Sequence, residues 1–233
     1  DPDGDWSSDV CSSDLCVEYF RRGSAASHLS VADVSPILLS ARHLHATGIP
    51  AALSLSAREL SWHLMTAMRE AGRSVSFDPN LRPSLWSNQA QMISEINRLA
   101  VLAHWVMPGL TEGALLTGYE DPEDMAAFYL DQGVEAVVIK LGAKGAYYRT
   151  QMDQGFVAGV PVVNVVDTVG AGDGFAVGVI SALLENQGFT QAVARGNWIG
   201  SRAVQNRGDM EGLPLRAQLL AAEPADEPRR RPA

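Results

Sequence analysis

The sequence predicts an α/β fold built around a mostly parallel sheet. Short apolar runs that suit strands alternate with amphipathic segments of about 10–15 residues that suit helices. This alternation is typical of βαβ units, in which a helix connects one parallel strand to the next. The chain has 233 residues, of which 46% are hydrophobic and 19% charged, so it can bury a large core. This composition excludes a disordered, collagen-like or coiled-coil protein.

Each element is assigned from its own pattern, in order along the chain. A continuous apolar run that stops at Gly or Pro indicates a strand, and apolar residues that recur every three or four positions indicate a helix. The expected strands cover residues 51–55, 75–77, 105–107 and 136–141, followed by an antiparallel pair at 147–148 and 155–166. The expected helices cover 57–71, 88–102, a segment with Thr111 as N-cap, 122–132, a long helix opened by Gly170, and two more.

The two ends of the chain differ from the middle. Residues 1–15 are acidic and rich in serine and show no amphipathic period, so we expect no folded structure there. The string WSSDVCSSDL within them also resembles a translated sequencing adapter, which would make the segment an artefact. Residues 219–233 are rich in proline and are predicted to form a disordered tail. A single folded domain is therefore expected over residues 16–218.

Charge and cysteine content limit the partners and the compartment. Lys and Arg total 18 against 27 Asp and Glu, a net charge of −9, which gives no long-range attraction for nucleic acid or an anionic membrane. No run approaches the roughly 18 apolar residues of a membrane span, and no signal-peptide pattern opens the chain. The two cysteines exclude a disulfide scaffold, and the five histidines form no metal cluster. His43 and His45 alternate on a segment that suits a strand. We expect a cytoplasmic protein without nucleic-acid or membrane partners.

The most informative segment is DTVGAGD at residues 167–173, between an apolar strand and an amphipathic helix. Its small residues let the backbone approach a ligand closely, and amides at a helix N-terminus favour an anion such as phosphate. A carboxylate beside an anion site repels phosphate, so Asp173 needs another purpose, and taking a proton from an attacking hydroxyl is the natural one. The spacing alone is also compatible with a tight strand–helix connection that Asp173 caps. The segment fits neither a Walker A loop nor a GxGxxG loop.

DTVGAGD resembles the C-terminal signature of the ribokinase-like sugar kinases, the PfkB carbohydrate kinase family. In that family the Gly-Ala-Gly amides stabilise the transferring phosphoryl group and the aspartate is the general base. The resemblance assigns these roles to Gly170, Ala171, Gly172 and Asp173. It extends from about residue 16 to about residue 215, and implies a ribokinase-like three-layer sandwich. Segments 16–30, 47–54, 76–86 and 140–148 are most similar to members that phosphorylate 2-keto-3-deoxygluconate.

The resemblance implies that Tyr19, Arg21 and Arg82, together with Asp173, hold the substrate. The chemistry of these residues agrees, because a sugar acid carries a carboxylate to which a planar guanidinium can donate two parallel hydrogen bonds. A neutral sugar does not require such a group. Each residue also has a plain structural interpretation: Tyr19 as a packed aromatic ring, Arg21 as a solvated charge at a strand edge, and Arg82 as part of a loop salt bridge.

The resemblance also locates the nucleotide. The loop KLGAKG at residues 140–145 follows a buried strand and would lie along ATP, with small residues that allow close approach. Asn197, on a late helix, would lie near the adenine; a polar residue on a helix surface is the alternative. The residues that the resemblance assigns to nucleotide binding are Asn80, Arg82, Lys140, Gly142, Gly145, Gly170, Ala171, Gly172 and Asn197.

The resemblance implies Mg²⁺ and a monovalent cation such as K⁺. The family holds Mg²⁺ through an Asn-x-x-Glu pattern, and Mg²⁺ in proteins usually keeps several waters. Here the segment is GLTE, so Glu112 is present and Gly109 replaces the asparagine. We therefore expect Glu112 to contact the metal indirectly. Asp167 and Thr168 resemble the family's monovalent-cation loop.

One departure from the family concerns its N-terminal part. The first strand, a Gly-rich sugar-contacting segment and most of a small β-sheet lid have no counterpart in this sequence, apart from a lid remnant near residues 16–24. In the family the lid closes over the sugar and excludes water, and it would mediate any homo-oligomer of the full-length protein. Without these strands the sheet is expected to expose an edge.

The sequence favours an ATP-dependent kinase whose partners are ATP and a small sugar acid. Three alternatives stay open. Another kinase of the same family, for fructose or a different keto acid, would retain Asp173 but would not need both arginines. An inactive fragment would bind the nucleotide without turnover. A purely structural α/β domain would do neither, and the intact Gly-Ala-Gly-Asp segment argues against it.

Overall fold

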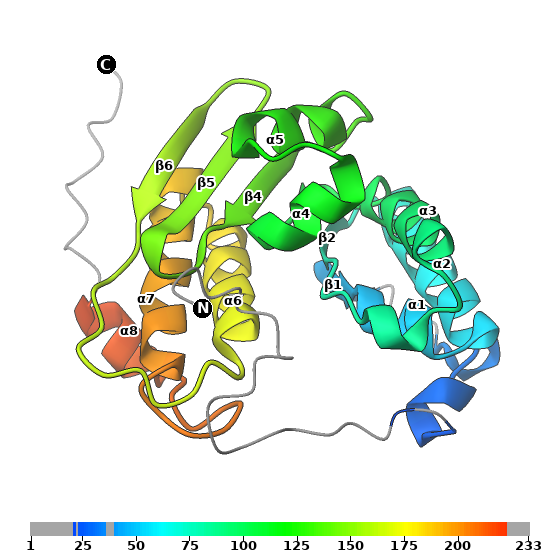
Figure 1. The fold of residues 1–233 in the computed structure, drawn as a ribbon, viewed down its shortest axis with the longest axis horizontal. Helices are drawn as coiled ribbons and strands as arrows, with labels where there is room; N and C mark the ends of the chain where they lie inside the picture. The colour runs from blue at the N-terminus through cyan, green and yellow to red at the C-terminus, as the bar shows by residue number, and fades with distance from the viewer. Residues whose placement is uncertain (1–20, 22, 36–39, 223–233) are drawn as a thin grey trace.

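The structure is a computed structural model that describes residues 21, 23–35 and 40–222 (Figure 1). In these residues six strands form one sheet, in the order β1-β2-β3-β4-β5-β6. Neighbours from β1 to β4 are parallel, and β5 and β6 add an antiparallel hairpin. The predicted, mostly parallel sheet is confirmed. The strands are β1 (His43–Thr47), β2 (Ser74–Asp78), β3 (Trp105–Val106), β4 (Ala136–Lys140), β5 (Gly145–Thr150) and β6 (Gln154–Ala158).

Helices cover the two faces of this sheet, which gives three layers (Figure 1). One layer contains α2, α3 and α5, and the other contains α6 and α7. Within the described ranges, no helix combines the length and the apolarity that crossing a bilayer requires. The helices are α1 (Gly48–Leu53), α2 (Leu55–Glu70), α3 (Gln89–Ala100), α4 (Leu110–Thr117), α5 (Pro122–Leu130), α6 (Ala171–Leu184), α7 (Phe189–Ala203) and α8 (Arg216–Ala222), with short 3-10 turns η1 (Ala25–His28), η2 (Val31–Asp33), η4 (Pro83–Leu85) and η5 (Gly142–Lys144).

Alternation along the strands divides the interior into two cores. In β4, Val137 and Ile139 face one core and Val138 faces the other. Burial of each such side chain contributes about 1.5–3 kcal/mol, so both helical layers are held firmly against the sheet. The first core is filled from α2, α3 and α5 by Met65, Ile96 and Tyr129, and the second from α6 and α7 by Phe175, Val179 and Val193.

Residues 51–55, expected to form a strand, lie largely in helix α1. The strand is the preceding β1, which carries the alternating His43 and His45. Pro50 fits the first turn of a helix, and Ala51 is fully buried in the first core. The prediction was wrong because a short apolar run does not distinguish a buried strand from a buried helix.

Two other boundaries differ from the prediction. Helix α4 begins after Gly109 and not after Thr111, because the Glu112 carboxylate accepts the N–H of Gly109 at 2.9 Å and stabilises the earlier start. The last strand ends at Ala158 and does not continue to residue 166. The Gly159 N–H still donates to the Lys144 carbonyl at 2.9 Å, but β5 begins at Gly145 and the chain before it forms the turn η5, so the partner strand ends here.

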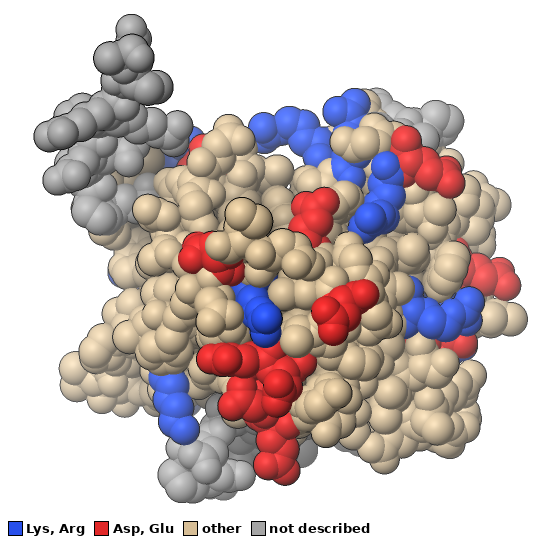
Figure 2. Space-filling model, turned by 90° about the horizontal axis from the view of Figure 1, so that it is seen from above, with Lys and Arg blue, Asp and Glu red and all other residues tan. Residues whose placement is uncertain are grey.

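The C-terminal boundary also changes. Residues 219–222, which we expected to belong to a disordered tail, are helical, because α8 continues to Ala222. Residues 223–233 and 1–20 lie outside the described ranges, as do the expectations for the segment 1–15 and for most of the lid remnant. On the face in Figure 2, acidic side chains lie at several places and form their largest group near the lower centre, with Lys and Arg between them.

Helices α6 and α7 approach each other closely through glycines. A Cβ atom added at Gly178 would lie 2.6 Å from the Cα of Gly196, and one added at Gly196 would lie 2.9 Å from a methyl group of Val179. These distances are too short for a side chain of any size, so glycine alone fits this crossing. The close packing against α7 fixes the orientation of α6 and therefore the position of its N-terminus.

We predict that Gly178→Ala destabilises the fold. The new methyl group would clash with backbone atoms of α7, so the loss of unfolding free energy should lie at the upper end of about 1–3 kcal/mol. That cost exceeds the roughly 1 kcal/mol by which Ala favours a helix over Gly. The urea midpoint measures the change. The control is Val177→Ala at a position that is 54% exposed, which should change stability by less than about 0.5 kcal/mol. Equal stability of Gly178→Ala and wild type would contradict the close crossing.

A hydrogen-bonded ladder of His and Ser joins β1 to β2. The Nδ1 and Nε2 atoms of His43 each lie 2.8 Å from a hydroxyl, those of Ser74 and Ser76 respectively. The Nδ1 atom of His45 lies 2.8 Å from the same Ser76 hydroxyl. His43 also stacks on Trp105 of β3, with ring centroids 5.1 Å apart. Burial, followed by repulsion from His45 and His104, lowers the pKa of His43 to about 4.

The lowered pKa of His43 predicts a pH-dependent stability. An unfolded histidine titrates near 6.5, so between about pH 6.5 and 4 the unfolded chain binds a proton that the folded chain does not. The free energy of unfolding should therefore fall as the pH drops through this window. His43→Gln should reduce the slope, as measured by urea midpoints from pH 7 to 4.5, whereas His63→Gln at an exposed position should leave it unchanged. An unaltered slope in His43→Gln would refute this assignment.

Candidate active site

The carboxyl ends of two parallel strands meet in a buried ion pair. Asp78 ends β2 and Lys140 ends β4, and Lys140 Nζ donates to Asp78 Oδ2 at 2.6 Å. The side chains are 2% and 14% exposed, respectively. The Lys140 N–H also donates to the Pro108 carbonyl at 2.9 Å, which holds the end of β4 beside the start of α4. This edge of the sheet is where parallel α/β proteins bind ligands.

Glu112 joins two loops at the same edge. It lies in the first turn of α4, where Oε1 accepts the Leu81 N–H at 2.6 Å and Oε2 accepts the Gly109 N–H at 2.9 Å. Burial raises the pKa of Glu112, opposed by the positive charge of Lys140. Although burial alone would lower the pKa of Lys140, the charges of Asp78, Glu112 and Asp173 raise it, so the lysine remains charged.

The Gly-Ala-Gly segment forms the N-terminus of α6. Gly170 is its N-cap, with a φ of +76° that glycine adopts readily, and a Cβ there would lie 2.5 Å from the Asp209 carbonyl oxygen. Asp173 therefore lies in the first turn and does not cap the helix, which removes that alternative. In the first turn, the Ala171 N–H donates to the Thr168 carbonyl at 3.3 Å, whereas the N–H groups of Gly172 and Asp173 have no preceding helical turn to accept their hydrogens. This helix N-terminus can therefore receive an anion.

The lysine lies beside this helix N-terminus. A Cβ added at Gly172 would lie 3.8 Å from Lys140 Nζ. Asp173 is close enough for its charge to raise the pKa of Lys140 and to oppose the lowering of the pKa of His45, which falls to about 4 mainly through burial. One edge of the sheet therefore carries a carboxylate, an ammonium group and a helix N-terminus together.

A small cavity of about 50 Å³ opens at this point. Asn197 lines it but is also tied to the sheet, because its Nδ2 donates to the carbonyls of Val157 and Ala158 at 3.0 and 3.1 Å. Asn197 is therefore buried rather than a helix-surface residue. The structure thus brings together most of the residues expected to bind the nucleotide. The cavity lining is Lys140, Gly142, Gly145, Ala171, Gly172, Phe175, Asn197 and Gly200.

The loop after β2 places two more of the expected residues at the same edge. Asn80 has a φ of +40°, which Asn tolerates better than most residues, and its N–H donates to Asp78 Oδ1 at 3.2 Å. Arg82 is buried, and its Nη1 donates to the Leu81 carbonyl at 2.7 Å. Both therefore belong to a tight loop that begins at the ion pair.

The two N-terminal substrate residues are placed less directly. Tyr19 lies outside the described residues. Arg21 is half-buried and precedes η1, which packs against α1 at the carboxyl end of β1. Their contact with a substrate stays a prediction.

The candidate metal residues take part in loop closure. The Asp167 carboxylate accepts the N–H groups of Val169 at 3.0 Å and Gly208 at 3.3 Å, which closes the turn before Gly170. Over the described ranges, no group of three or more His, Cys, Asp or Glu side chains is arranged to hold a metal ion by itself. Indirect contact of Glu112 with Mg²⁺ and the monovalent-cation loop at Asp167 and Thr168 stay predictions.

Two residues at this edge were not expected from the sequence. Asp78 directly follows the expected strand at residues 75–77, and neither it nor His45 is among the site residues expected from the sequence. The available signal for Asp78 was a carboxylate directly after a buried strand, on the same edge as Lys140. No spacing in the sequence indicates their pairing, because 62 residues separate them.

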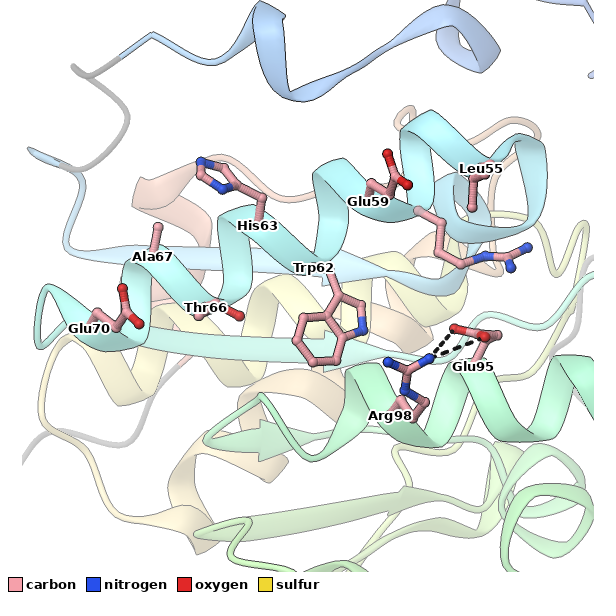
Figure 3. A pocket seen from close by; sticks show the side chains of 10 residues that line it. Leu55, Glu59, Trp62, His63, Thr66, Ala67, Glu70, Glu95 and Arg98 are labelled. Carbon is pink, nitrogen blue, oxygen red and sulfur yellow. Dashed lines mark hydrogen bonds and ion pairs between the residues drawn. The ribbon is translucent and has the colours of Figure 1, made fainter.

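A larger pocket of about 560 Å³ lies between α2 and α3 (Figure 3). Its polar groups include Arg98, which pairs with Glu95 at 3.3 Å and lies over the ring of Trp62 at 5.1 Å. None of the expected site residues lines it. The candidate site is therefore the edge at Lys140 and Asp173.

The chain is similar to known carbohydrate kinases. The sequence model of the pfkB family carbohydrate kinases matches residues 19–216. A 2-dehydro-3-deoxygluconokinase of Bacillus subtilis is 52% identical over 215 residues, which cover 92% of this chain and 66% of that protein. A crystal structure of a PfkB protein from Polaromonas sp. JS666 is 54% identical with a TM-score of 0.82, covering 91% of this chain and 68% of that one. A fructokinase from Vibrio cholerae O395, solved with fructose, ADP and calcium, is 32% identical with a TM-score of 0.77. The match covers 86% of this chain and 66% of that one.

The chain spans less than two thirds of the length of the curated relatives named first, 66% of the Bacillus subtilis kinase and 52% of an aminoimidazole riboside kinase from Salmonella typhimurium. The matched range nevertheless contains every described loop of the site, from Asp78 to Asn197. Architecture, site geometry and sequence similarity agree, and the chain belongs to the pfkB family of carbohydrate kinases.

Proposed function

We propose that this chain carries the phosphoryl-transfer centre of an ATP-dependent sugar-acid kinase. The reaction moves the γ-phosphoryl group of ATP to the primary hydroxyl of 2-keto-3-deoxygluconate and gives the 6-phosphate. The observation that carries the proposal is the meeting of Asp173, Lys140 and the α6 N-terminus at one edge of the sheet. The name of the Bacillus subtilis relative supports the choice of sugar acid.

In the transfer step, the substrate hydroxyl oxygen forms a bond to the γ-phosphorus while the bond from that phosphorus to the ADP oxygen breaks. Asp173 accepts the hydroxyl proton, which makes the oxygen a better nucleophile. The amides of residues 170–172 donate to the phosphoryl oxygens on which negative charge accumulates. General-base catalysis of this kind typically contributes about 10²–10⁴-fold.

The residues present fit a nucleotide. The cavity beside Lys140 is lined by glycines, and a Cβ at Gly145 would lie 2.1 Å from the Val157 carbonyl oxygen, so this turn retains its shape only with glycine. Bound Mg²⁺ would neutralise phosphate charge, with Glu112 contacting one of its waters. Carboxylate oxygens accept more than one hydrogen bond, so the two amide contacts of Glu112 leave room for this.

The acid group of the substrate would be held by arginine. Arg82 lies in the loop that begins at the Asp78–Lys140 pair, and this position supports a role for its guanidinium in holding the substrate. Arg21 and Tyr19 would complete the clamp from the N-terminal segment. A fructokinase activity is the second candidate, supported by the 32% identity to the Vibrio cholerae enzyme solved with fructose.

We predict that Asp173→Asn lowers turnover by about 10²–10⁴-fold, since the amide cannot accept the proton. The assay is ADP release by the 233-residue chain with ATP, Mg²⁺ and 2-keto-3-deoxygluconate. Asp131→Asn, at an exposed position on α5's C-terminal side, is the matched control and should retain the wild-type rate. Near-wild-type turnover by Asp173→Asn would exclude the general-base role.

We predict that Arg21→Gln raises KM for the sugar acid by about tenfold while KM for ATP changes little, because a charge-assisted contact to the carboxylate is lost. Arg73→Gln, at an exposed position, is the control. Fructose and ribose serve as comparison substrates for the wild-type chain. Turnover of fructose but not of the keto acid would reject the acid substrate in favour of the second candidate. No turnover of any of the three sugars, by a chain that still binds ATP, would reject catalysis by this chain alone.

A further inference from the structure

We propose that Asp78 is a positioning residue that aims the Lys140 ammonium group at the phosphoryl group to be transferred. The proposal rests on the proposed function only in taking ATP as the nucleotide. It assigns a role to a carboxylate that neither the DTVGAGD segment nor the KLGAKG loop contains.

The carboxylate of Asp78 is held firmly on both oxygens. Oδ1 accepts the N–H of Asn80 at 3.2 Å, and Oδ2 accepts from Lys140 Nζ at 2.6 Å. The residue lies at the end of a strand that is buried on both sides and is itself 2% exposed. A carboxylate fixed in this way determines where the end of the flexible lysine side chain lies.

Glu112, the other carboxylate near Lys140, has a different role. Both oxygens of Glu112 accept backbone N–H groups, those of Leu81 and Gly109. The Lys140 ammonium group donates instead to Asp78. Glu112 therefore holds the two loops together, while Asp78 holds the lysine.

The position of the ammonium group points to the phosphoryl group. Nζ lies 3.8 Å from the place of a Cβ at Gly172, and Lys140 lines the cavity formed with Ala171 and Gly172. An ammonium group has three hydrogens to donate, and Asp78 takes one of them. The others are available toward the anion site at the α6 N-terminus.

This arrangement also resolves a conflict of charge. Asp173 is needed as a base, yet its negative charge repels a phosphoryl group. Lys140 lies near enough for Asp173 to raise its pKa, and it therefore offsets that repulsion at the reacting edge. A buried ion pair of this kind is often less stable than apolar residues of similar volume, so stability alone does not explain its presence.

The test is the affinity for ATP compared with ADP, each with excess Mg²⁺, by isothermal titration calorimetry of the 233-residue chain. Wild type should bind ATP more tightly than ADP. In Lys140→Met the ratio of the two affinities should fall about tenfold to a hundredfold, because a charge-assisted contact to the terminal phosphoryl is lost. In Asp78→Asn the ratio should fall by roughly threefold to tenfold, since the ammonium remains but is no longer aimed.

A double variant separates positioning from stability. Asp78→Asn leaves a buried lysine without its partner and is expected to lower Tm, whereas Asp78→Asn with Lys140→Met removes both charges and should recover Tm. The double variant should nevertheless show the same low ratio as Lys140→Met, because Asp78 acts only through the lysine. Asp78→Glu should restore part of the ratio. Arg73→Met, which removes an exposed positive charge outside the site, is the control and should match wild type.

Several results would overturn the proposal. An unchanged or increased ratio in Asp78→Asn would remove the positioning role. Equal affinity of the wild-type chain for ATP and ADP, including no binding of either, would remove the contact of Lys140 with the terminal phosphoryl. A ratio that responds as expected in a chain that phosphorylates fructose but not the sugar acid would leave this inference standing and refute the proposed substrate.

Discussion

The candidate site depends on the buried ion pair between Lys140 and Asp78. It joins the ends of β4 and β2 across the intervening β3, at the edge where the sheet can receive a ligand. Losing one partner of a buried pair typically costs about 3–5 kcal/mol of folding free energy. A movement of the neighbouring loops that separates the two charges is therefore unfavourable. The Asn80 turn, the Glu112 contacts and the start of α4 are all arranged around it.

A second constraint comes from glycine at positions where no side chain fits. Gly170 lets the chain turn sharply into α6 beside the Asp209 carbonyl, and Gly178 and Gly196 let α6 lie directly against α7. The turn and the crossing together bring the amides of the α6 N-terminus next to the Lys140 ammonium group. Opposite charges and backbone donors thus lie close together at the α6 N-terminus, an arrangement that suits the proposed phosphoryl transfer.

Much of this arrangement could be predicted from the sequence, where local pattern and local structure agree. The alternation of strands and helices, the turn at Gly170 and the glycine-lined loop at 140–145 follow from residue type and spacing. Helix α1 was mistaken for a strand because its short apolar run fits both. The Asp78–Lys140 pair and the bond from Asn197 to β6 join residues 62 and about 40 positions apart, and such contacts are set by strand order, which spacing does not encode.

The proposed chemistry requires the Lys140 ammonium group and the α6 N-terminus to form one phosphoryl site. A crystal structure of this chain with Mg²⁺ and an ATP analogue whose terminal phosphoryl cannot be transferred would test this. We expect the terminal phosphoryl group within hydrogen-bond distance of Lys140 Nζ and of the amides of Gly170–Gly172, with Asp78 still bonded to the lysine. A terminal phosphoryl bound elsewhere, or a Lys140 side chain turned away from it, would show that the two do not form one site.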